Sequence, residues 1–132
     1  MKVYNFFLAI MILLFLGCSS NTEDVELAKN TVDKFYFLDE QNDYKSIDSL
    51  ISTQFYIATP YYELVEFLKN KKITMGSFKE KELESYNISV STNSKTQVFL
   101  KYKIKYTIKE VQESFLLEKD RNVFKIVKYS IQ

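Results

Sequence analysis

Residues 97–108 read QVFLKYKIKYTI, and this stretch decides the fold of the chain. Every second position is aliphatic or aromatic, namely Val98, Leu100, Tyr102, Ile104, Tyr106 and Ile108. Three of the six other positions in the stretch are lysine. An alternation of period two over so many residues predicts a long β-strand with one buried face and one solvent face.

The stretches around this strand predict the rest of an antiparallel sheet. Residues 111–119 and 123–131 have the same pattern, and short polar connections at Lys109-Glu110 and Asp120-Arg121-Asn122 join the strands. A further strand precedes them, and its charged first part, residues 78–84, is either an edge strand or a loop.

The N-terminal half predicts three helices that cover the apolar face of this sheet. Asp43 is expected to cap the second, short helix, and Thr59-Pro60 to start the third, with Thr as the cap and Pro at the first helical position. Gly76 follows and is expected to mark a turn with positive φ. One apolar face of the first helix, which runs to about Leu38, is made by Val25, Ala28, Val32, Phe35 and Tyr36. The predicted class is therefore α+β, with N-terminal helices packed on a curved antiparallel β-sheet of about four strands.

The composition is that of one globular domain. The chain has 132 residues, 27% of them charged, with two glycines and one proline. A chain of this size buries about two-thirds of its unfolded surface on folding, which suits a single core. The formal net charge of +1 provides no general field that would favour nucleic acid. There is no histidine, so the commonest general base and metal ligand are missing, and we expect no metal and no cofactor.

The N-terminus carries a short hydrophobic segment that ends at the only cysteine. Lys2 precedes an uncharged run over residues 6–16, which is shorter than the roughly 20 residues of a spanning helix and suits a signal peptide. The run ends in FLGCSS, residues 15–20. This ending resembles the lipobox of bacterial lipoproteins, in which Cys18 would be acylated and become the new N-terminus. An ordinary secretory peptide or short anchor with a chance cysteine is the alternative.

The lipobox resemblance implies an organisation and a location. Residues 1–17 would be a lipoprotein signal peptide, 18–24 the acylated cysteine and a tether, and 25–132 a single α+β domain. The lipid on Cys18 would anchor the protein to a membrane of the cell envelope, with the domain facing the periplasm or the cell exterior. Without a second cysteine the mature domain has no internal disulfide, so packing alone must hold it together.

The order of the predicted elements resembles the nuclear transport factor 2-like fold, also called the cystatin-like cone. A long aromatic-faced first helix, the short helix after Asp43-Tyr44, the Thr59-Pro60 helix and the long strands carry the resemblance. Residues 113–131 also resemble the ending of small bacterial lipoproteins of this fold. Such domains commonly have a pocket between sheet and helices, and they often pair through the open face of the sheet, so a homodimer is an alternative to a monomer. The residues expected to line the pocket are Tyr36, Tyr61, Tyr102, Tyr106, Glu113 and Tyr129. A filled core made of the same tyrosines is the competing interpretation.

The predicted hairpin register places Glu113 on the aromatic face of the sheet. A turn at Lys109-Glu110 sets Tyr106 opposite Glu113. One hypothesis puts Glu113 in the pocket with a raised pKa, hydrogen-bonded to a tyrosine, as a ligand-orienting group or general base. The other puts it in water at the pocket mouth or the strand end.

The same register predicts the outer face of the sheet. Glu118 would stand between Lys101 and Lys125, forming a ladder of opposite charges across three strands. The outer lysines are therefore interpreted as a solvated, partly paired face, with a docking site for an acidic partner as the alternative.

The sequence has no motif for catalysis. It contains no Gly-rich phosphate loop, no nucleophile elbow and no metal-spaced Cys/His set. Some enzymes of the resembled fold use an Asp–His or an Asp–Tyr arrangement, and a chain without histidine departs from the first of these. We therefore expect a non-enzymatic domain that binds a small apolar ligand or acts as an interaction module in the envelope. The alternatives are an inhibitor or immunity-type protein that binds a secreted enzyme, and a cavity enzyme that uses Glu113 and tyrosines.

Overall fold

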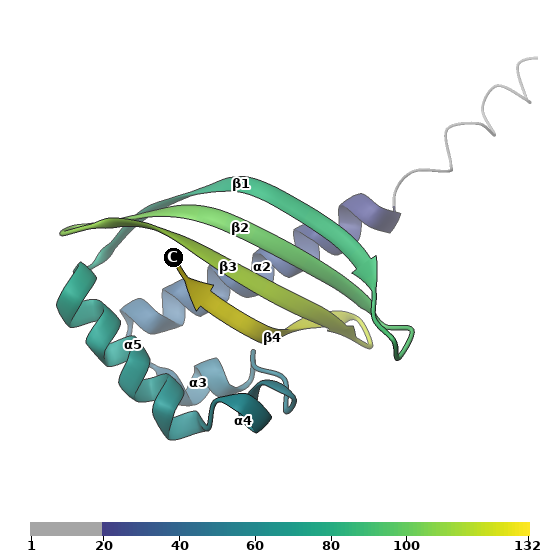
Figure 1. The fold of residues 1–132 in the computed structure, drawn as a ribbon, viewed down its shortest axis with the longest axis horizontal. Coiled ribbons are helices and arrows are strands. Elements are labelled where there is room, and N and C mark those ends of the chain that lie inside the picture. Colours follow the sequence, from purple (N-terminus) through teal and green to yellow (C-terminus); the bar gives the residue numbers. More distant parts are fainter. Residues whose placement is uncertain (1–19) are drawn as a thin grey trace, which may run out of the picture.

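The computed structural model describes residues 20–132, so the expected signal peptide and Cys18 lie outside the described residues. The helices come first and the strands follow (Figure 1). The strands form one antiparallel sheet in the order β1-β2-β3-β4, which is curved and not closed, and this confirms the predicted α+β class. The elements are α2 (Ser20–Glu40), α3 (Tyr44–Asp48), α4 (Phe55–Ala58), α5 (Tyr61–Met75), β1 (Phe78–Val90), β2 (Thr96–Tyr106), β3 (Glu110–Asp120) and β4 (Val123–Ile131).

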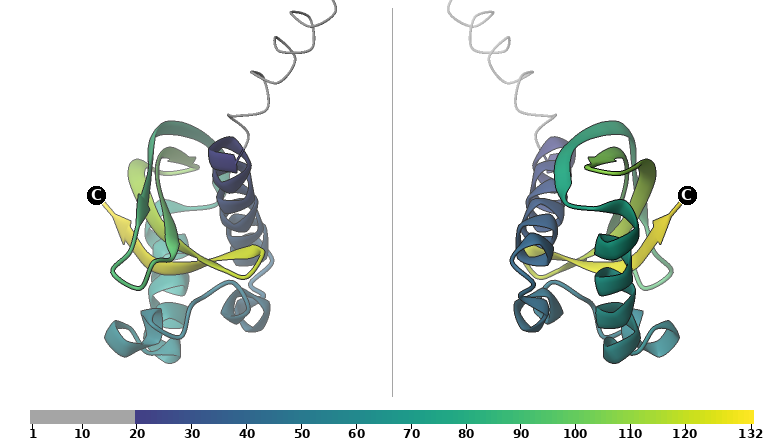
Figure 2. Two further views of the ribbon diagram at one scale, coloured as in Figure 1. Left: turned by 90° about the vertical axis from the view of Figure 1, so that its right-hand side faces the viewer. Right: turned by 90° about the vertical axis from the view of Figure 1, so that its left-hand side faces the viewer.

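The helices lie against one face of the sheet. In Figures 1 and 2, α2 runs along this face, and α3 and α4 lie at the end of the molecule remote from the start of α2. Several polar contacts fix α2 to the strands, and two of them involve β3 and β4 near the start and middle of the helix. The Thr31 hydroxyl donates to the Phe124 carbonyl of β4 at 3.0 Å, and Lys119 of β3 pairs with Asp24 at 2.7 Å.

The inner face of the sheet and the apolar stripe of α2 form the core. The alternation predicted for the central strand is confirmed as far as Tyr106, because each inward side chain of β2 from Val98 to Tyr106 is at most 4% exposed. Ile108 is an exception to the prediction and is 69% exposed. The strand ends at Tyr106, so Ile108 belongs to the loop rather than to the pleated face. The charged residues 78–84 lie in β1, which is an edge strand of the sheet.

The predicted register between the second and third long strands is wrong. A turn at Lys109-Glu110 would set Glu113 opposite Tyr106, whereas Glu113 pairs with Tyr102. The turn lies two residues earlier than predicted, because β2 ends at Tyr106, whose backbone N–H donates to the Lys109 carbonyl at 2.9 Å across Thr107 and Ile108. The pairing therefore moves four residues along β2. Since this is an even number, every side chain keeps its predicted face.

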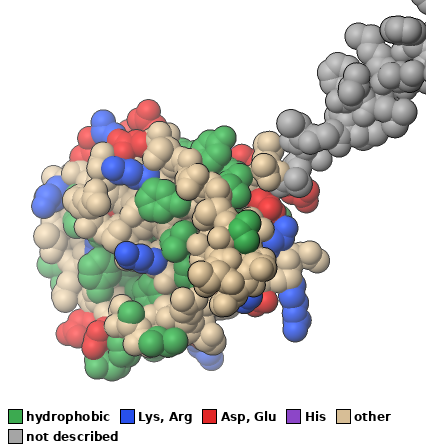
Figure 3. Space-filling view, turned by 45° about the vertical axis from the view of Figure 1, so that its right-hand side comes forward, with side chains coloured by type: hydrophobic (Ala, Val, Ile, Leu, Met, Phe, Trp, Pro, Cys, Tyr) green, Lys and Arg blue, Asp and Glu red, His purple; other side chains and the backbone are tan. Residues whose placement is uncertain are grey.

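The predicted outer charge ladder is not formed. Lys125 stands opposite Glu118 in the register of β3 and β4 as predicted, but its Nζ donates to the Ser49 carbonyl, and Glu118 forms an ion pair with Lys95 at 3.5 Å. The partner of Glu118 in β2 is Gln97, whose amide donates to the carboxylate at 2.9 Å. Lys101 faces Ser114 instead, as a consequence of the shifted register. The outer face is nevertheless partly paired by other contacts, namely Lys103–Glu110 at 3.1 Å and Lys105–Glu80 at 3.8 Å. Figure 3 shows hydrophobic side chains in several separate groups among lysines and carboxylates.

The helix boundaries follow local capping chemistry, with one exception. Asp43 caps α3 as predicted, and its carboxylate accepts from the Ser46 backbone N–H. The predicted start of the third helix is off by one residue. Pro60 occupies the N-cap position and α5 begins at Tyr61. Thr59 does not cap this helix, because it ends α4, a short helix that the sequence did not predict.

Candidate functional site

The Glu113 carboxylate is the centre of a buried polar cluster inside the domain. Its side chain is 0% exposed and points to the inner face of β3. The hydroxyls of Tyr36 and Tyr129 donate to its Oε2 at 2.6 and 2.7 Å, and the hydroxyl of Tyr106 donates to its Oε1. Glu113 therefore lies in the interior and not at a pocket mouth or a strand end.

Each tyrosine reaches Glu113 from a different element. Tyr36 lies on the inward stripe of α2, Tyr106 ends β2, and Tyr129 lies on β4 opposite Phe115. A register shift between Leu116 and Leu117 precedes the pairing of Phe115 with Tyr129. The carboxylate thus ties together one helix and three of the four strands.

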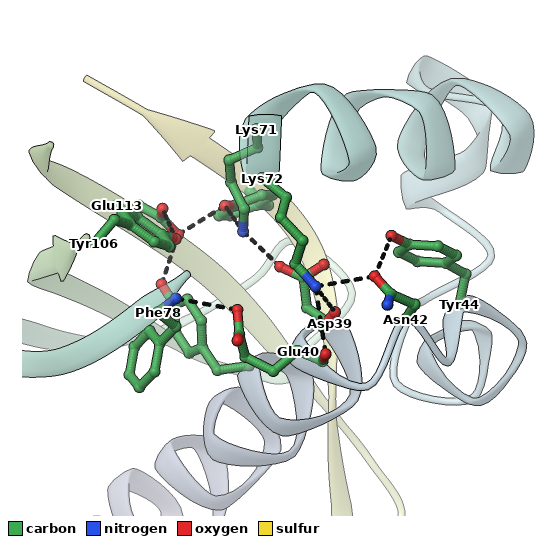
Figure 4. A network of polar contacts seen from close by, with 11 residues as sticks. Asp39, Glu40, Asn42, Tyr44, Lys71, Lys72, Phe78, Tyr106 and Glu113 are labelled. Atoms are coloured by element: carbon green, nitrogen blue, oxygen red, sulfur yellow. Dashed lines mark hydrogen bonds and ion pairs between the residues drawn. The ribbon is translucent and has the colours of Figure 1, made fainter. Parts of the chain in front are cut away.

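A buried ion pair extends this cluster to the helices (Figure 4). Lys71 Nζ of α5 lies 2.8 Å from Asp39 Oδ2 of α2, and the two side chains are 2% and 4% exposed. Lys71 also donates to the Tyr129 hydroxyl at 3.3 Å. Its ammonium group lies within 5.7 Å of four aromatic ring centroids, those of Phe35, Tyr36, Tyr106 and Tyr129.

The C-terminal end of α2 explains why α5 supplies lysines here. The last turn of α2 contains Asp39 and Glu40 and no basic residue, which is unfavourable next to the partial negative charge of a helix C-terminus. Lys72 donates to the Asp39 carbonyl at 3.0 Å, to the Glu40 carbonyl at 3.3 Å and to Asn42 Oδ1 at 2.9 Å. Lys71 and Lys72 together therefore compensate the end of α2.

The environment of the cluster suppresses ionisation of its tyrosines. Burial, and then the Glu113 carboxylate, raise the pKa of Tyr36 and of Tyr129 well above the ordinary value. The same two causes raise the pKa of Tyr106. All three hydroxyls are thus protonated donors, which matches a carboxylate that only accepts.

This geometry describes a closed interior around Glu113. Both oxygens of Glu113 already accept hydrogen bonds from the protein, and the side chain has no solvent contact. A general base must come within hydrogen-bond reach of its substrate. In this structure the tyrosines occupy that position, so the cluster organises the core.

The remaining residues expected at the pocket lie elsewhere or lack polar partners. Tyr102 is 1% exposed, and its buried hydroxyl has no hydrogen-bond partner. Tyr61 is 41% exposed on α5 and packs edge-on against Tyr56, at 6.3 Å between ring centroids. The structure therefore brings together Tyr36, Tyr106, Tyr129 and Glu113 and leaves Tyr61 outside this group.

Sequence reasoning missed Lys71 and Asp39 as members of the cluster. Lys71 follows Leu64 and Leu68 at intervals of four and three residues, however, and this spacing continues the buried stripe of α5. That register is the signal that could have placed Lys71 inside.

An open groove with mostly apolar walls lies between α3 and α5, on the outer side of the helices. It has a volume of about 680 Å³. Its walls include Tyr44, Tyr61, Tyr62 and Val65. Two acidic residues and two lysines also line it, namely Asp43, Glu66, Lys45 and Lys69. The side chain of Tyr62 is 67% exposed. We call this feature the α3–α5 groove.

Comparisons with known proteins provide no name for this arrangement, since no family model and no curated protein matches the chain. Among residues 20–132, no helix is both long and apolar enough to cross a membrane. The same part of the chain contains no cluster of three or more acidic side chains that could hold a metal ion.

Proposed function

We propose that this chain is a lipid-anchored domain of the bacterial envelope that works by binding another protein rather than by catalysis. The α3–α5 groove would take an apolar, uncharged segment of that partner. The proposal rests on the lipobox-like sequence at Cys18 for the anchor and on the described residues for the binding surface.

The burial of Glu113 is the observation that favours a binding site on the protein surface over a ligand or catalytic site inside the domain. A cavity enzyme or an enclosed ligand site would need access to this carboxylate, and three tyrosine hydroxyls occupy its acceptors. The expectation of a small apolar ligand inside the domain, like the resemblance to the nuclear transport factor 2-like fold, stays a prediction.

The shape and charge of the α3–α5 groove favour an uncharged macromolecular segment. The groove is open, so it would cover only one side of a small molecule, whereas drug-sized ligands are usually buried over most of their surface. Its two acids and two lysines balance, so its rim selects neither an acidic nor a basic partner. Exposed tyrosines are typical of protein interfaces, because each offers a large ring with a polar tip.

The position of the groove suits a tethered protein. The helices α3 and α5 lie at the end of the molecule remote from the start of α2 (Figures 1 and 2). A chain anchored at Cys18 would therefore present the groove away from its point of attachment.

Replacement of Cys18 by alanine tests the anchor. We expect the wild-type chain in the membrane fraction with an acylated N-terminal peptide by mass spectrometry, and the variant without acyl mass. An unmodified Cys18 in the wild-type chain would contradict this part of the proposal.

Site-specific photo-crosslinking in cells tests the groove. A photoreactive phenylalanine at position 62 lies in the groove, and one at the exposed position 128 of β4 is the matched control. We expect a discrete protein adduct from position 62 that is lost with Val65→Asp, and none from position 128. Adducts of equal yield at both positions, or at neither, would contradict the proposed binding surface.

A further inference from the structure

A second depression lies between α2 and β1, on a part of the surface that the α3–α5 groove does not include. It has a volume of about 350 Å³ and is lined by Asp33, Tyr36, Phe37, Glu40, Phe78 and Lys81. Three of these six residues are aromatic. The rings of Tyr36 and Phe78 are stacked at 4.9 Å between centroids, and Phe37 is 64% exposed.

The charges at this depression favour a cation. Two carboxylates and one ammonium group line it, which leaves a net charge of −1 when all three are ionised. The ammonium group of Lys81 is already engaged, since its Nζ lies 2.6 Å from Asp33 Oδ1 and 5.6 Å from the ring centroid of Tyr102. In this contact the protein's own ammonium group lies between a carboxylate and an aromatic ring, which is the arrangement that an amine ligand would need.

Glu40 is the carboxylate that remains for a ligand. Its Oε1 accepts from the Phe78 backbone N–H at 3.1 Å, and within residues 20–132 it forms no ion pair. Phe37 lies three residues before Glu40 on the same helix, so the exposed ring and the carboxylate are neighbours on one face of α2.

We propose that this depression binds a primary amine attached to a small apolar group. The apolar group would lie on the rings of Phe37 and Phe78, and the ammonium group would pair with Glu40. Aromatic faces attract cations in addition to apolar groups, so the two parts of the ligand and the two parts of the site match. The proposal is independent of the partner suggested for the α3–α5 groove.

Calorimetric titration of the full chain in lipid nanodiscs tests this site, with empty nanodiscs subtracted. Phenethylamine is the probe, and 2-phenylethanol, which has the same ring and no charge, is the matched ligand. We expect saturable one-to-one binding of the amine, and binding of the alcohol that is at least about tenfold weaker. Glu40→Gln should weaken the amine to a similar extent while its amide oxygen still accepts from Phe78.

Two further variants serve as a control and as an independent test. Glu23→Gln makes the same charge change at an exposed position near the start of α2 and should leave amine binding unchanged. Phe37→Ala removes an exposed ring and should weaken the amine even if Glu40→Gln fails to fold. The absence of saturable amine binding at millimolar concentration, or equal binding of amine and alcohol, would overturn the proposal.

Discussion

Lys71 Nζ lies 2.8 Å from Asp39 Oδ2, and both side chains are almost entirely removed from solvent. The pair joins the C-terminal half of α5 to the last turn of α2, and the bond from Lys71 to Tyr129 continues the connection to the sheet. Because buried charges are costly unless they are paired, this contact makes the packing of the helices depend on one lysine.

Replacement of Lys71 by methionine should strongly destabilise the domain. The variant keeps the length of the side chain but leaves the Asp39 carboxylate buried without its counter-ion, at a cost of about 3–5 kcal/mol. Unfolding in denaturant measures the difference. The double variant Asp39→Asn/Lys71→Met should recover much of the loss, and Lys79→Met at an exposed site of β1 should lose little. Equal stability of Lys71→Met and the wild type would contradict the role assigned to this pair.

Replacement of Glu113 should separate its role as an acceptor from its charge. Glu113→Ala leaves three buried tyrosine hydroxyls without their acceptor, and each unsatisfied group costs about 1–3 kcal/mol. Glu113→Gln keeps one acceptor oxygen and should be destabilised less than Glu113→Ala. The free energy of unfolding ranks the two variants. A ranking in the opposite order would show that the hydroxyls do not depend on this carboxylate.

The raised pKa values of the clustered tyrosines predict instability at alkaline pH. Unfolded tyrosine has a pKa of about 10, and the folded values of Tyr36, Tyr106 and Tyr129 lie higher. The unfolded chain therefore loses these protons first as the pH rises. Their contribution is fully present below about pH 10 and decreases above it, by up to about 1.4 kcal/mol per pH unit for each tyrosine.

Unfolding experiments between about pH 8 and pH 11 measure this slope. Tyr36→Phe removes one titrating group and should make the slope shallower. Tyr86→Phe, at a position that is 58% exposed, is the control and should leave the slope as in the wild type. Identical slopes for Tyr36→Phe and the wild type would contradict the raised pKa of Tyr36.

The faces of the sheet could be predicted from the sequence, but its register could not. Alternation along β2 identifies the inward side chains whatever their partners are, and it placed Glu113 on the inner face. The partner of Glu113 depends on where the turn between β2 and β3 lies, and the turn lies at Thr107-Ile108 rather than at Lys109-Glu110. The shift by four residues changed every pair between β2 and β3, but it left each side chain on its predicted face.

The composition of the buried cluster was only partly predictable for a related reason. Tyr36 and Tyr106 follow an apolar periodicity, so their inward position could be inferred. Lys71 follows the same periodicity on α5, but a lysine near a helix end is usually solvated, and its counter-ion Asp39 lies on another helix. Tyr61 was expected inside, whereas the inward stripe of α5 runs through Leu64, Leu68 and Lys71.

Gly76 is a position where the backbone requires glycine. Its φ of +86° confirms the predicted positive value, and a Cβ there would overlap Thr107 Oγ1. Gly76→Ala should therefore destabilise the domain by more than about 1 kcal/mol. Thermal or denaturant unfolding provides the measurement. Gly76→Ala/Thr107→Ala removes the overlap and should recover only part of the loss, because the strained φ remains. An alanine variant as stable as the wild type would contradict this account.

The exchange of tyrosine hydroxyl protons with water tests the closed interior most directly. Nuclear magnetic resonance of the full chain in nanodiscs can compare the hydroxyls that bond Glu113 with that of the exposed Tyr62. The account predicts that the protons of Tyr36, Tyr106 and Tyr129 exchange slowly and that Glu113→Ala removes this protection. Exchange as fast as that of Tyr62 in the folded wild-type chain would mean that solvent reaches Glu113, and it would contradict the claim that this protein works through its surface.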